Sequence, residues 1–325
     1  MVRRLTSLEL CAGSGGLALG LETAGFDPVV LVDELGVACE TLRVNRPYWV
    51  VKQMDVRDFR PALSPELYGV DLLSAGLPRL KATASNLRKR GAESEIELVK
   101  ATLSIASEVR ARGVLIDNVP DIVTAEKYSQ LRNFIRHELE DLGYNCQFFV
   151  LNAADFGLPQ DRKHGFLLAL DSVAVTRFRI PVPSPHPRVT VGEALVASMQ
   201  SGGWDDAGRW AEQARIIAPT LVGGSWDRGG ADLGPTGTKR AWARIGVDGA
   251  TLGDIVPGID FEWAPQTGRH GMVRLTVDQT AMLQGFPSDW HVLGGKTAQY
   301  RQIANAVPPP LAFALGESIA TAMRV

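Results

Sequence analysis

Short apolar runs alternate with amphipathic stretches over roughly the first half of the chain. The runs have the length of buried strands, and the stretches between them carry apolar residues at helical spacing. This alternation favours an α/β fold, a mostly parallel sheet with helices on both faces. The expected strands are Leu5–Leu10, Pro28–Val32, Val70–Ser74, Gly113–Asp117, Cys146–Leu151 and Gly165–Leu170, and the expected helices are Gly15–Ala24, Gly36–Asn45, Glu93–Arg112 and Gln130–Leu142.

The pattern changes after Pro181. Residues 181–270 hold closely spaced prolines, Gly-Gly pairs and five tryptophans, with no long periodic element. This composition predicts a small, loop-rich second domain. The helical pattern returns from Leu275, and Pro310–Val325 is expected to be a helix that packs back on the first domain. We therefore expect a first domain over 1–171, a second over 172–270, and a segment 271–325 that completes the first.

Composition narrows the class of protein. The 325 residues are 45% hydrophobic and 22% charged, as in a soluble globular protein, and no run approaches the roughly 20 apolar residues of a membrane span. The N-terminus reaches a glycine turn too early for a signal peptide, so a cytoplasmic location is expected. Three scattered cysteines indicate neither a disulfide framework nor a metal site. The net charge of −2 does not exclude nucleic-acid binding through a local basic surface.

The first strand runs into a glycine-rich turn that contains Gly13 and Gly15. Glycines allow the backbone to approach a nucleoside, and the helix that follows offers free N–H groups. Asp33 and Glu34 follow about 20 residues later, where acids accept hydrogen bonds from ribose hydroxyls. Asp55 ends the next unit, where it could meet an adenine amino group. Each acid alone could be a helix cap or a solvated charge, but together they favour a nucleoside-bearing cofactor.

Several further motifs carry a family resemblance: Asp71–Pro78, Ile116–Val119, Gln160–Arg162, Leu283–Pro287 and, most specific, Tyr300–Pro310. With the opening turn, they resemble the DNA cytosine-5 methyltransferases of restriction–modification systems, over nearly the whole chain. The resemblance implies a Rossmann-like methyltransferase fold with S-adenosylmethionine as cofactor. It also implies a catalytic domain over 1–171, a target-recognition domain over 172–270 and double-stranded DNA as partner, with the target cytosine flipped out of the duplex. The implied cofactor residues are Cys11, Gly13, Gly15, Asp33, Glu34, Asp55, Val56, Asn305 and Val307.

The chain departs from the family at the positions that act on the base. The family's cysteine nucleophile follows Pro78, where this chain has Arg79, a permanent cation that cannot attack a base. The family's glutamate is replaced by Asp117, one methylene shorter. Arg162 remains, but the second arginine of that motif is His164, and Ala304 replaces a glycine.

Other nucleophiles offer no clear substitute. Thr83 and Ser85 lie in the same loop without an evident base, and Cys11 is best interpreted as a packed thiol. We therefore expect no ordinary cytosine methylation by this chain alone.

Basic residues suggest a surface for DNA. Phosphate contacts are expected from the loop after Arg79, and base or phosphate contacts from glycine-rich loops of the second domain. A solvated loop is the alternative for any such charge run. The residues are Lys81, Arg88, Lys89, Arg90, Arg228, Lys239 and Arg240.

Three functions stay open from the sequence. The chain could be a methyltransferase that uses another nucleophile or a catalytic partner subunit, or a non-catalytic DNA-binding subunit for specificity or regulation. It could also carry out altered nucleobase chemistry that needs no cysteine adduct. The residues around Arg79 favour the non-catalytic subunit, a pseudoenzyme that retains the cofactor site.

Overall fold

The computed structural model describes residues 3–79, 92–223 and 230–324. The chain folds into two compact units. The first comprises residues 1–151, 163–182 and 311–325, and the second comprises residues 152–162 and 183–310.

The first unit is built on a seven-stranded sheet in the order β3-β2-β1-β4-β5-β7-β6. The neighbours from β3 to β5 are parallel, whereas β7 is antiparallel to β5, so the sheet is mixed. The strands are β1 (Leu5–Leu10), β2 (Phe26–Asp33), β3 (Val51–Gln53), β4 (Leu72–Gly76), β5 (Gly113–Asn118), β6 (Asn145–Asn152) and β7 (Lys163–Leu170).

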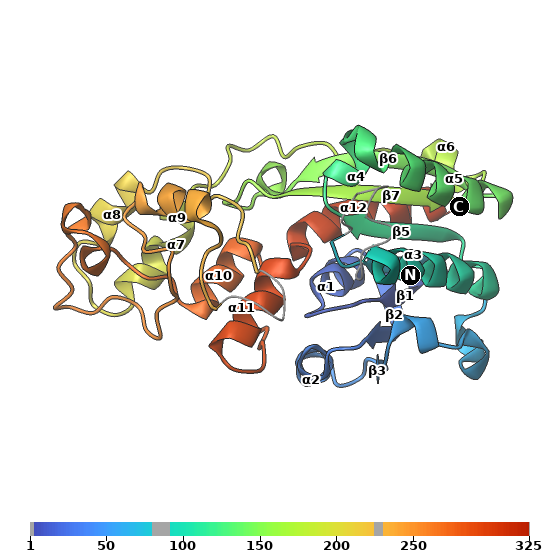
Figure 1. The fold of residues 1–325 in the computed structure, drawn as a ribbon, viewed down its shortest axis with the longest axis horizontal. Helices are drawn as coiled ribbons and strands as arrows, with labels where there is room; N and C mark the ends of the chain where they lie inside the picture. Colours follow the sequence, from blue (N-terminus) through green and yellow to red (C-terminus); the bar gives the residue numbers. More distant parts are fainter. Residues whose placement is uncertain (1–2, 80–91, 224–229, 325) are drawn as a thin grey trace. The chain divides into compact units, whose positions relative to one another are not determined.

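Helices cover both faces of this sheet, and Figure 1 shows α3 on one side and α12 on the other. The helices of the first unit are α1 (Gly16–Thr23), α2 (Gly36–Asn45), α3 (Ala92–Val109), α4 (Asp121–Thr124), α5 (Ser129–Asp141), α6 (Ala174–Arg177) and most of α12 (Pro309–Met323). This confirms the predicted α/β class. The three-residue strand β3 was not predicted, because a run so short carries almost no periodic signal.

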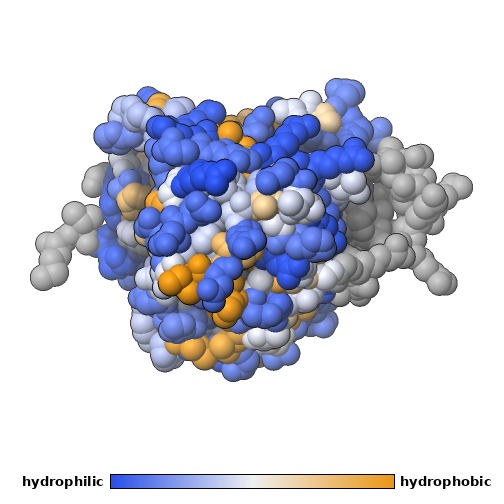
Figure 2. Space-filling model, turned by 90° about the vertical axis from the view of Figure 1, so that its left-hand side faces the viewer, coloured by the Kyte–Doolittle hydropathy of each residue, from blue (hydrophilic) through white to orange (hydrophobic). Residues whose placement is uncertain are grey.

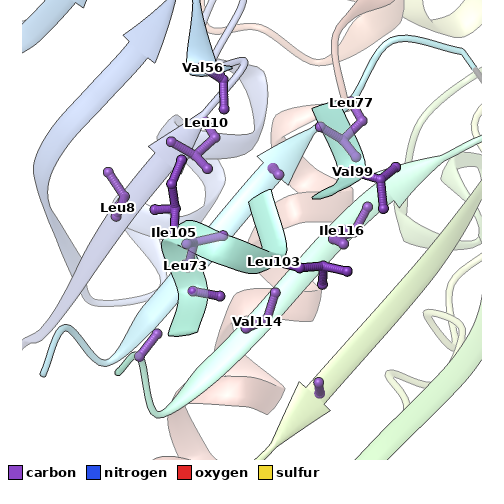
Figure 3. Close-up of a cluster of buried hydrophobic side chains, with 14 of the residues drawn as sticks. Leu8, Leu10, Val56, Leu73, Leu77, Val99, Leu103, Ile105, Val114 and Ile116 are labelled. Atoms are coloured by element: carbon purple, nitrogen blue, oxygen red, sulfur yellow. The ribbon is translucent and has the colours of Figure 1, made fainter. Parts of the chain in front are cut away.

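The core between α3 and the sheet follows from alternation along the strands. Leu8 and Leu10 of β1 and Leu73 of β4 point to one face of the sheet, and Leu103 and Ile105 of α3 belong to the same buried cluster (Figure 3). These side chains are at most 4% exposed. Burial on both faces is expected of strands in a parallel sheet. This packing on both faces of the sheet holds the ends of β1, β4 and β5 in fixed positions.

The second unit has its own hydrophobic core, in which Trp204, Trp210 and Trp242 are buried. Its helices are α7 (Val191–Gln200), α8 (Ala207–Gln213), α9 (Thr236–Ala243), α10 (Val277–Gln284) and α11 (Lys296–Asn305). No long periodic element was expected over 181–270, yet α7 lies there, and a capping box between Thr190 and Glu193 starts it. Residues 271–325 are shared between the units, because α10 and α11 belong to the second and most of α12 to the first.

Candidate cofactor and base-contacting sites

The turn after β1 has the backbone conformation that its glycines were expected to provide. Gly13 has a φ of 55°, and a Cβ placed on it would meet no atom within 4 Å, so the turn faces open space. The Gly13 N–H donates to Asp33 Oδ2 at 2.8 Å, and the Leu35 N–H donates to Asp33 Oδ1 at 2.8 Å. The buried Asp33 therefore ties the turn after β1 to the end of β2.

Three predicted acids lie close enough to the turn to raise the pKa of the Cys11 thiol. The pKa of Cys11 is raised far above its ordinary value, first by burial and then by the negative charges of Asp33, Glu34 and Asp55. The structure thus brings together these four predicted cofactor residues, which come from the ends of three successive β-α units. Such convergence at the carboxyl edge of a parallel sheet is where α/β proteins bind ligands.

Asp55 also caps a helix, which was the alternative expectation for this acid. Its side chain accepts from the Arg57 N–H at 2.8 Å and caps a short 3₁₀ helix that begins at Val56. The Arg57 guanidinium is also paired with it, and these hydrogen bonds hold the pKa of Asp55 below its usual value. Val56 itself is buried.

Arg79 lies three residues beyond β4, close to the same turn. A Cβ on Gly76, the last residue of β4, would be 3.2 Å from the carbonyl oxygen of Cys11. Asn118 at the end of β5 donates its Nδ2 to the carbonyls of Leu77 and Pro78, each at 3.1 Å. These contacts fix the backbone up to Arg79, whose side chain is exposed.

Asp117 and His164, flagged separately from the sequence, form a buried pair. His164 Nδ1 lies 2.8 Å from Asp117 Oδ1, and the imidazole stacks on Phe166 with ring centroids 6.0 Å apart. The register of β5 and β7 brings them together, since Asn118 is opposite Gly165. A Cβ on Gly165 would be 2.5 Å from the Val119 carbonyl oxygen, so the two strand ends approach closely. The pair is thus a carboxyl group and an imidazole joined by a buried hydrogen bond.

Arg162 lies in the second unit and links separate segments of it. Its Nη1 donates to the Leu221 carbonyl at 2.9 Å and its Nη2 to the Ala306 carbonyl at 3.3 Å. The neighbouring Asn305 is exposed, and a Cβ on Gly223 would be 2.7 Å from its Oδ1. Val307 is buried. The structure therefore assigns Arg162 a role in holding the Asn305 segment, and the cofactor role of Asn305 and Val307 stays a prediction.

The predicted DNA-contacting residues are only partly described. Lys239 and Arg240 lie on α9, where Lys239 Nζ is 3.1 Å from Asp232 Oδ2 and Arg240 is exposed. The other five lie outside the described residues: Lys81, Arg88, Lys89, Arg90 and Arg228.

Within the described ranges, no three His, Cys, Asp or Glu side chains are grouped as metal ligands would be, and no helix is long and apolar enough to cross a membrane.

Comparison with known proteins decides the family. Residues 5–321 match the model of the C-5 cytosine-specific DNA methylases. The chain belongs to this family. It is 38% identical over 327 residues to the Type II methyltransferase M.NaeI of Lentzea aerocolonigenes, covering all of this chain and 76% of that protein. It is also 38% identical over 329 residues to the Type II methyltransferase M.NgoMIV of Neisseria gonorrhoeae, covering 99% of each.

Solved structures agree on the fold of this C-5 cytosine methylase. A DNMT2 mutant from Spodoptera frugiperda superposes with a TM-score of 0.68 at 16% identity, over 97% of this chain and 99% of that one. EhMeth of Entamoeba histolytica gives 0.66 at 14% identity, over 97% and 98%. By family the chain is thus a restriction–modification type DNA cytosine-5 methyltransferase, and the family's cofactor is S-adenosylmethionine.

Sequence reasoning missed several residues that shape this methylase. Asn118 was part of a quoted motif, yet its hold on Leu77 and Pro78 could not be seen across about 40 residues. The buried Glu9 of β1, which accepts a hydrogen bond from Ser74, was also missed. An acid inside an apolar strand was the available signal, because acids are almost never fully buried without a partner.

Proposed function

We propose that this chain binds S-adenosylmethionine and double-stranded DNA but does not methylate cytosine by itself. It would then act as a specificity or regulatory member of its family. The observation that carries the proposal is the exposed Arg79, three residues beyond β4, at the position of the attacking cysteine in the family resemblance.

The surroundings of Arg79 support this assignment of position 79. Cysteine attack at cytosine C6 makes C5 nucleophilic enough to take a methyl group. The attacking atom must therefore lie close to the methyl donor. The close approach of Gly76 to the carbonyl of Cys11 holds the end of β4 beside the glycine turn, and Asn118 fixes Leu77 and Pro78. A guanidinium has no accessible lone pair with which to attack.

None of the three cysteines of the chain is suited to replace the missing nucleophile. Burial raises the pKa of Cys39 and of Cys146 to about 11. The pKa of Cys11 is higher still, for reasons of burial and neighbouring acids. At pH 7 a thiol with a pKa of about 11 is ionised in only about one molecule in 10⁴, and the thiolate is the reactive form.

The residues around the glycine turn fit the cofactor. Open space lies before Gly13, and the acids Asp33, the last residue of β2, and Glu34, the next residue, lie where ribose hydroxyls could be bound. Asp55 would have to exchange its bond with Arg57 for one to the adenine amino group. S-adenosylmethionine supplies an electrophilic methyl group on a sulfonium. In this chain we expect it to stabilise the bound conformation without transfer.

The test combines binding with turnover in one preparation. Calorimetry should show that the wild-type chain binds S-adenosylmethionine, and a radiolabel assay with mixed genomic duplex DNA should detect no methyl transfer above that of Arg79→Ala. Arg79→Cys, with Arg79→Ser as its matched control, asks whether a sulfur alone restores activity. Transfer by the wild type would overturn the loss of catalysis, and absence of cofactor binding would overturn the cofactor part.

A further inference from the structure

Asp248 in the second unit is a buried acid that holds two exposed arginines. The Arg269 Nε lies 2.9 Å from Asp248 Oδ1, and the Arg274 Nε lies 3.4 Å from Asp248 Oδ2. The side chain of Asp248 is 2% exposed, whereas those of Arg269 and Arg274 are 60% and 49% exposed. We call these three residues the arginine fork.

The backbone on both sides of the fork is well anchored. The Asp248 N–H donates to the Val273 carbonyl at 2.8 Å, the Val273 N–H to the Gly246 carbonyl at 3.0 Å, and the Gly253 N–H to the Leu275 carbonyl at 2.9 Å. Because Val273 and Leu275 are fully buried, Arg274 between them has a fixed backbone. This framework is what a site needs to hold its side chains in place.

Arg269 comes from a closed turn. The Ala264 N–H donates to the Gly271 carbonyl at 3.0 Å, and a Cβ on Gly271 would be 2.1 Å from the Ala264 carbonyl oxygen. Only glycine allows that approach, so the turn that presents Arg269 has little freedom.

The charge of Asp248 is compensated inside the protein. Burial alone would raise its pKa, but hydrogen bonds from Arg269 and from the Ala250 N–H, at 3.0 Å, hold the pKa below its usual value. The acid is therefore ionised at neutral pH, and a single negative charge orients two positive ones. The fork keeps a net positive charge at the surface.

Geometry leaves the ends of both guanidinium groups for a ligand. Each bond to Asp248 uses an Nε–H, so the terminal NH₂ groups of Arg269 and Arg274 are not taken up by the acid. Two parallel N–H groups at the end of a guanidinium match a pair of neighbouring acceptors, such as guanine O6 and N7 or two phosphate oxygens.

The fork lies beside a helix already predicted to contact DNA. A Cβ on Gly249 would be 3.2 Å from the Cα of Lys239 on α9, and the Leu233 N–H donates to the Gly249 carbonyl at 2.9 Å. Arg240 is exposed on the same helix. Figure 2 shows a mostly hydrophilic surface, broken by hydrophobic patches, on the face of the second unit that carries α7 to α9.

We propose that the arginine fork is a DNA-reading site, in which Asp248 is a positioning residue and Arg269 and Arg274 bind paired acceptors of duplex DNA. This inference rests on the DNA binding proposed above and names residues that perform it. The acceptors belong either to guanine edges in the major groove or to backbone phosphates, and the test below separates the two.

The test measures binding of the full chain to a random-sequence 24-bp duplex pool by fluorescence anisotropy. Arg269→Ala and Arg274→Ala should each weaken binding about tenfold. Arg215→Ala is the matched control, because Arg215 is an exposed arginine of the same unit whose partner, Glu212, is exposed rather than buried. It should bind as the wild type does.

Two further arms identify the acceptor. If the fork reads guanine, a pool built with 7-deazaguanine will weaken the wild type but not Arg274→Ala, and Arg274→Lys will not restore affinity, because an ammonium cannot bind two acceptors side by side. If it binds phosphate, Arg274→Lys will restore affinity, and Arg274→Ala will lower the salt slope by about one.

Asp248→Asn tests the positioning role, with thermal unfolding to confirm that the variant is folded. It should weaken binding as the arginine variants do, and adding Arg274→Ala to it should cost much less than tenfold. The inference is overturned if the wild type binds the pool and both arginine variants bind it equally well. If the wild type binds no duplex at all, the DNA-binding part of the proposed function fails with it.

Discussion

Two groups of strand ends in the first unit differ in the side chains that they carry. The end of β1 has an open glycine turn, a buried Asp33 that holds it, and further acids around Cys11. The ends of β5 and β7 keep their close approach, with Asn118 fixing the loop before Arg79, but they carry an Asp117–His164 pair. The backbone is thus held closely at both groups of strand ends, whereas their side chains differ. Fold and reaction are separate properties, because a reaction depends on the side chains of the site.

The largest effect should come from removing the acid that organises the glycine turn. Asp33→Ala deletes the acceptor of the Gly13 and Leu35 N–H groups, so the cofactor would have to order the turn itself; two bonds to a charged acceptor at about 2 kcal/mol each allow a loss of cofactor affinity of up to about a thousandfold. Calorimetry with S-adenosylmethionine measures this loss. Asp27→Ala is the control, since Asp27 lies on the same strand and pairs with Arg4 in an exposed position. Equal affinities of the two variants would remove Asp33 from the cofactor site.

The next effect concerns Glu9, two residues before Cys11 on the strand that ends in the turn. Burial raises the pKa of Glu9 from 4.5 to about 7. The protonated Glu9 contributes its full share to the free energy of unfolding below pH 4.5. This contribution is lost as the pH rises through about 7, because over that range the folded chain keeps a proton that the unfolded chain releases. Relative to wild type, Glu9→Gln should therefore gain about 3 kcal/mol in free energy of unfolding between about pH 4.5 and pH 8.

Urea unfolding of the wild type and Glu9→Gln at several pH values measures this gain. If the free energies of unfolding of the two proteins differed by the same amount at every pH in that range, Glu9 would be ionised in the folded chain and the prediction would be wrong.

A smaller effect, on the stability of the fold, is expected at the ends of β4 and β5. Asn118→Ala leaves the carbonyls of Leu77 and Pro78 without their donor, which should destabilise the fold by about 2 kcal/mol. Chemical denaturation measures the loss, and cofactor affinity should change little. A drop in affinity as large as that of Asp33→Ala would mean that the two groups of strand ends act as one site.

The smallest effect should be that of the Asp117–His164 pair on cofactor affinity. His164 is on β7, which lies three strands from β1, about 14 Å across the sheet, so His164→Ala should change the affinity for S-adenosylmethionine by no more than about twofold. Calorimetry again supplies the measurement, with wild type titrated in parallel. A tenfold change would tie the imidazole to the cofactor.

The strands and the cofactor turn were predictable because their signals are local. The apolar runs at Leu5–Leu10 and Gly113–Asp117 recur as β1 and β5, and the glycines of the turn carry its conformation in their residue type. The pairing of Asp117 with His164 was not predictable, since the residues lie 47 positions apart and meet only through the antiparallel register of β5 and β7. The pairing of Asp248 with Arg269 and Arg274 was not predictable either, because these arginines lie 21 and 26 residues away in the chain.

The most direct test of the account asks whether any side chain attacks cytosine. Duplexes of random sequence containing 5-fluorocytosine, incubated with the chain and S-adenosylmethionine, would trap an attacking residue, because fluorine at C5 prevents the elimination that frees it. Mass spectrometry then measures the adduct, with M.NgoMIV treated in parallel. The account predicts that the wild-type chain keeps its unmodified mass, and an adduct on Cys11, Cys39, Cys146 or any other residue would contradict it.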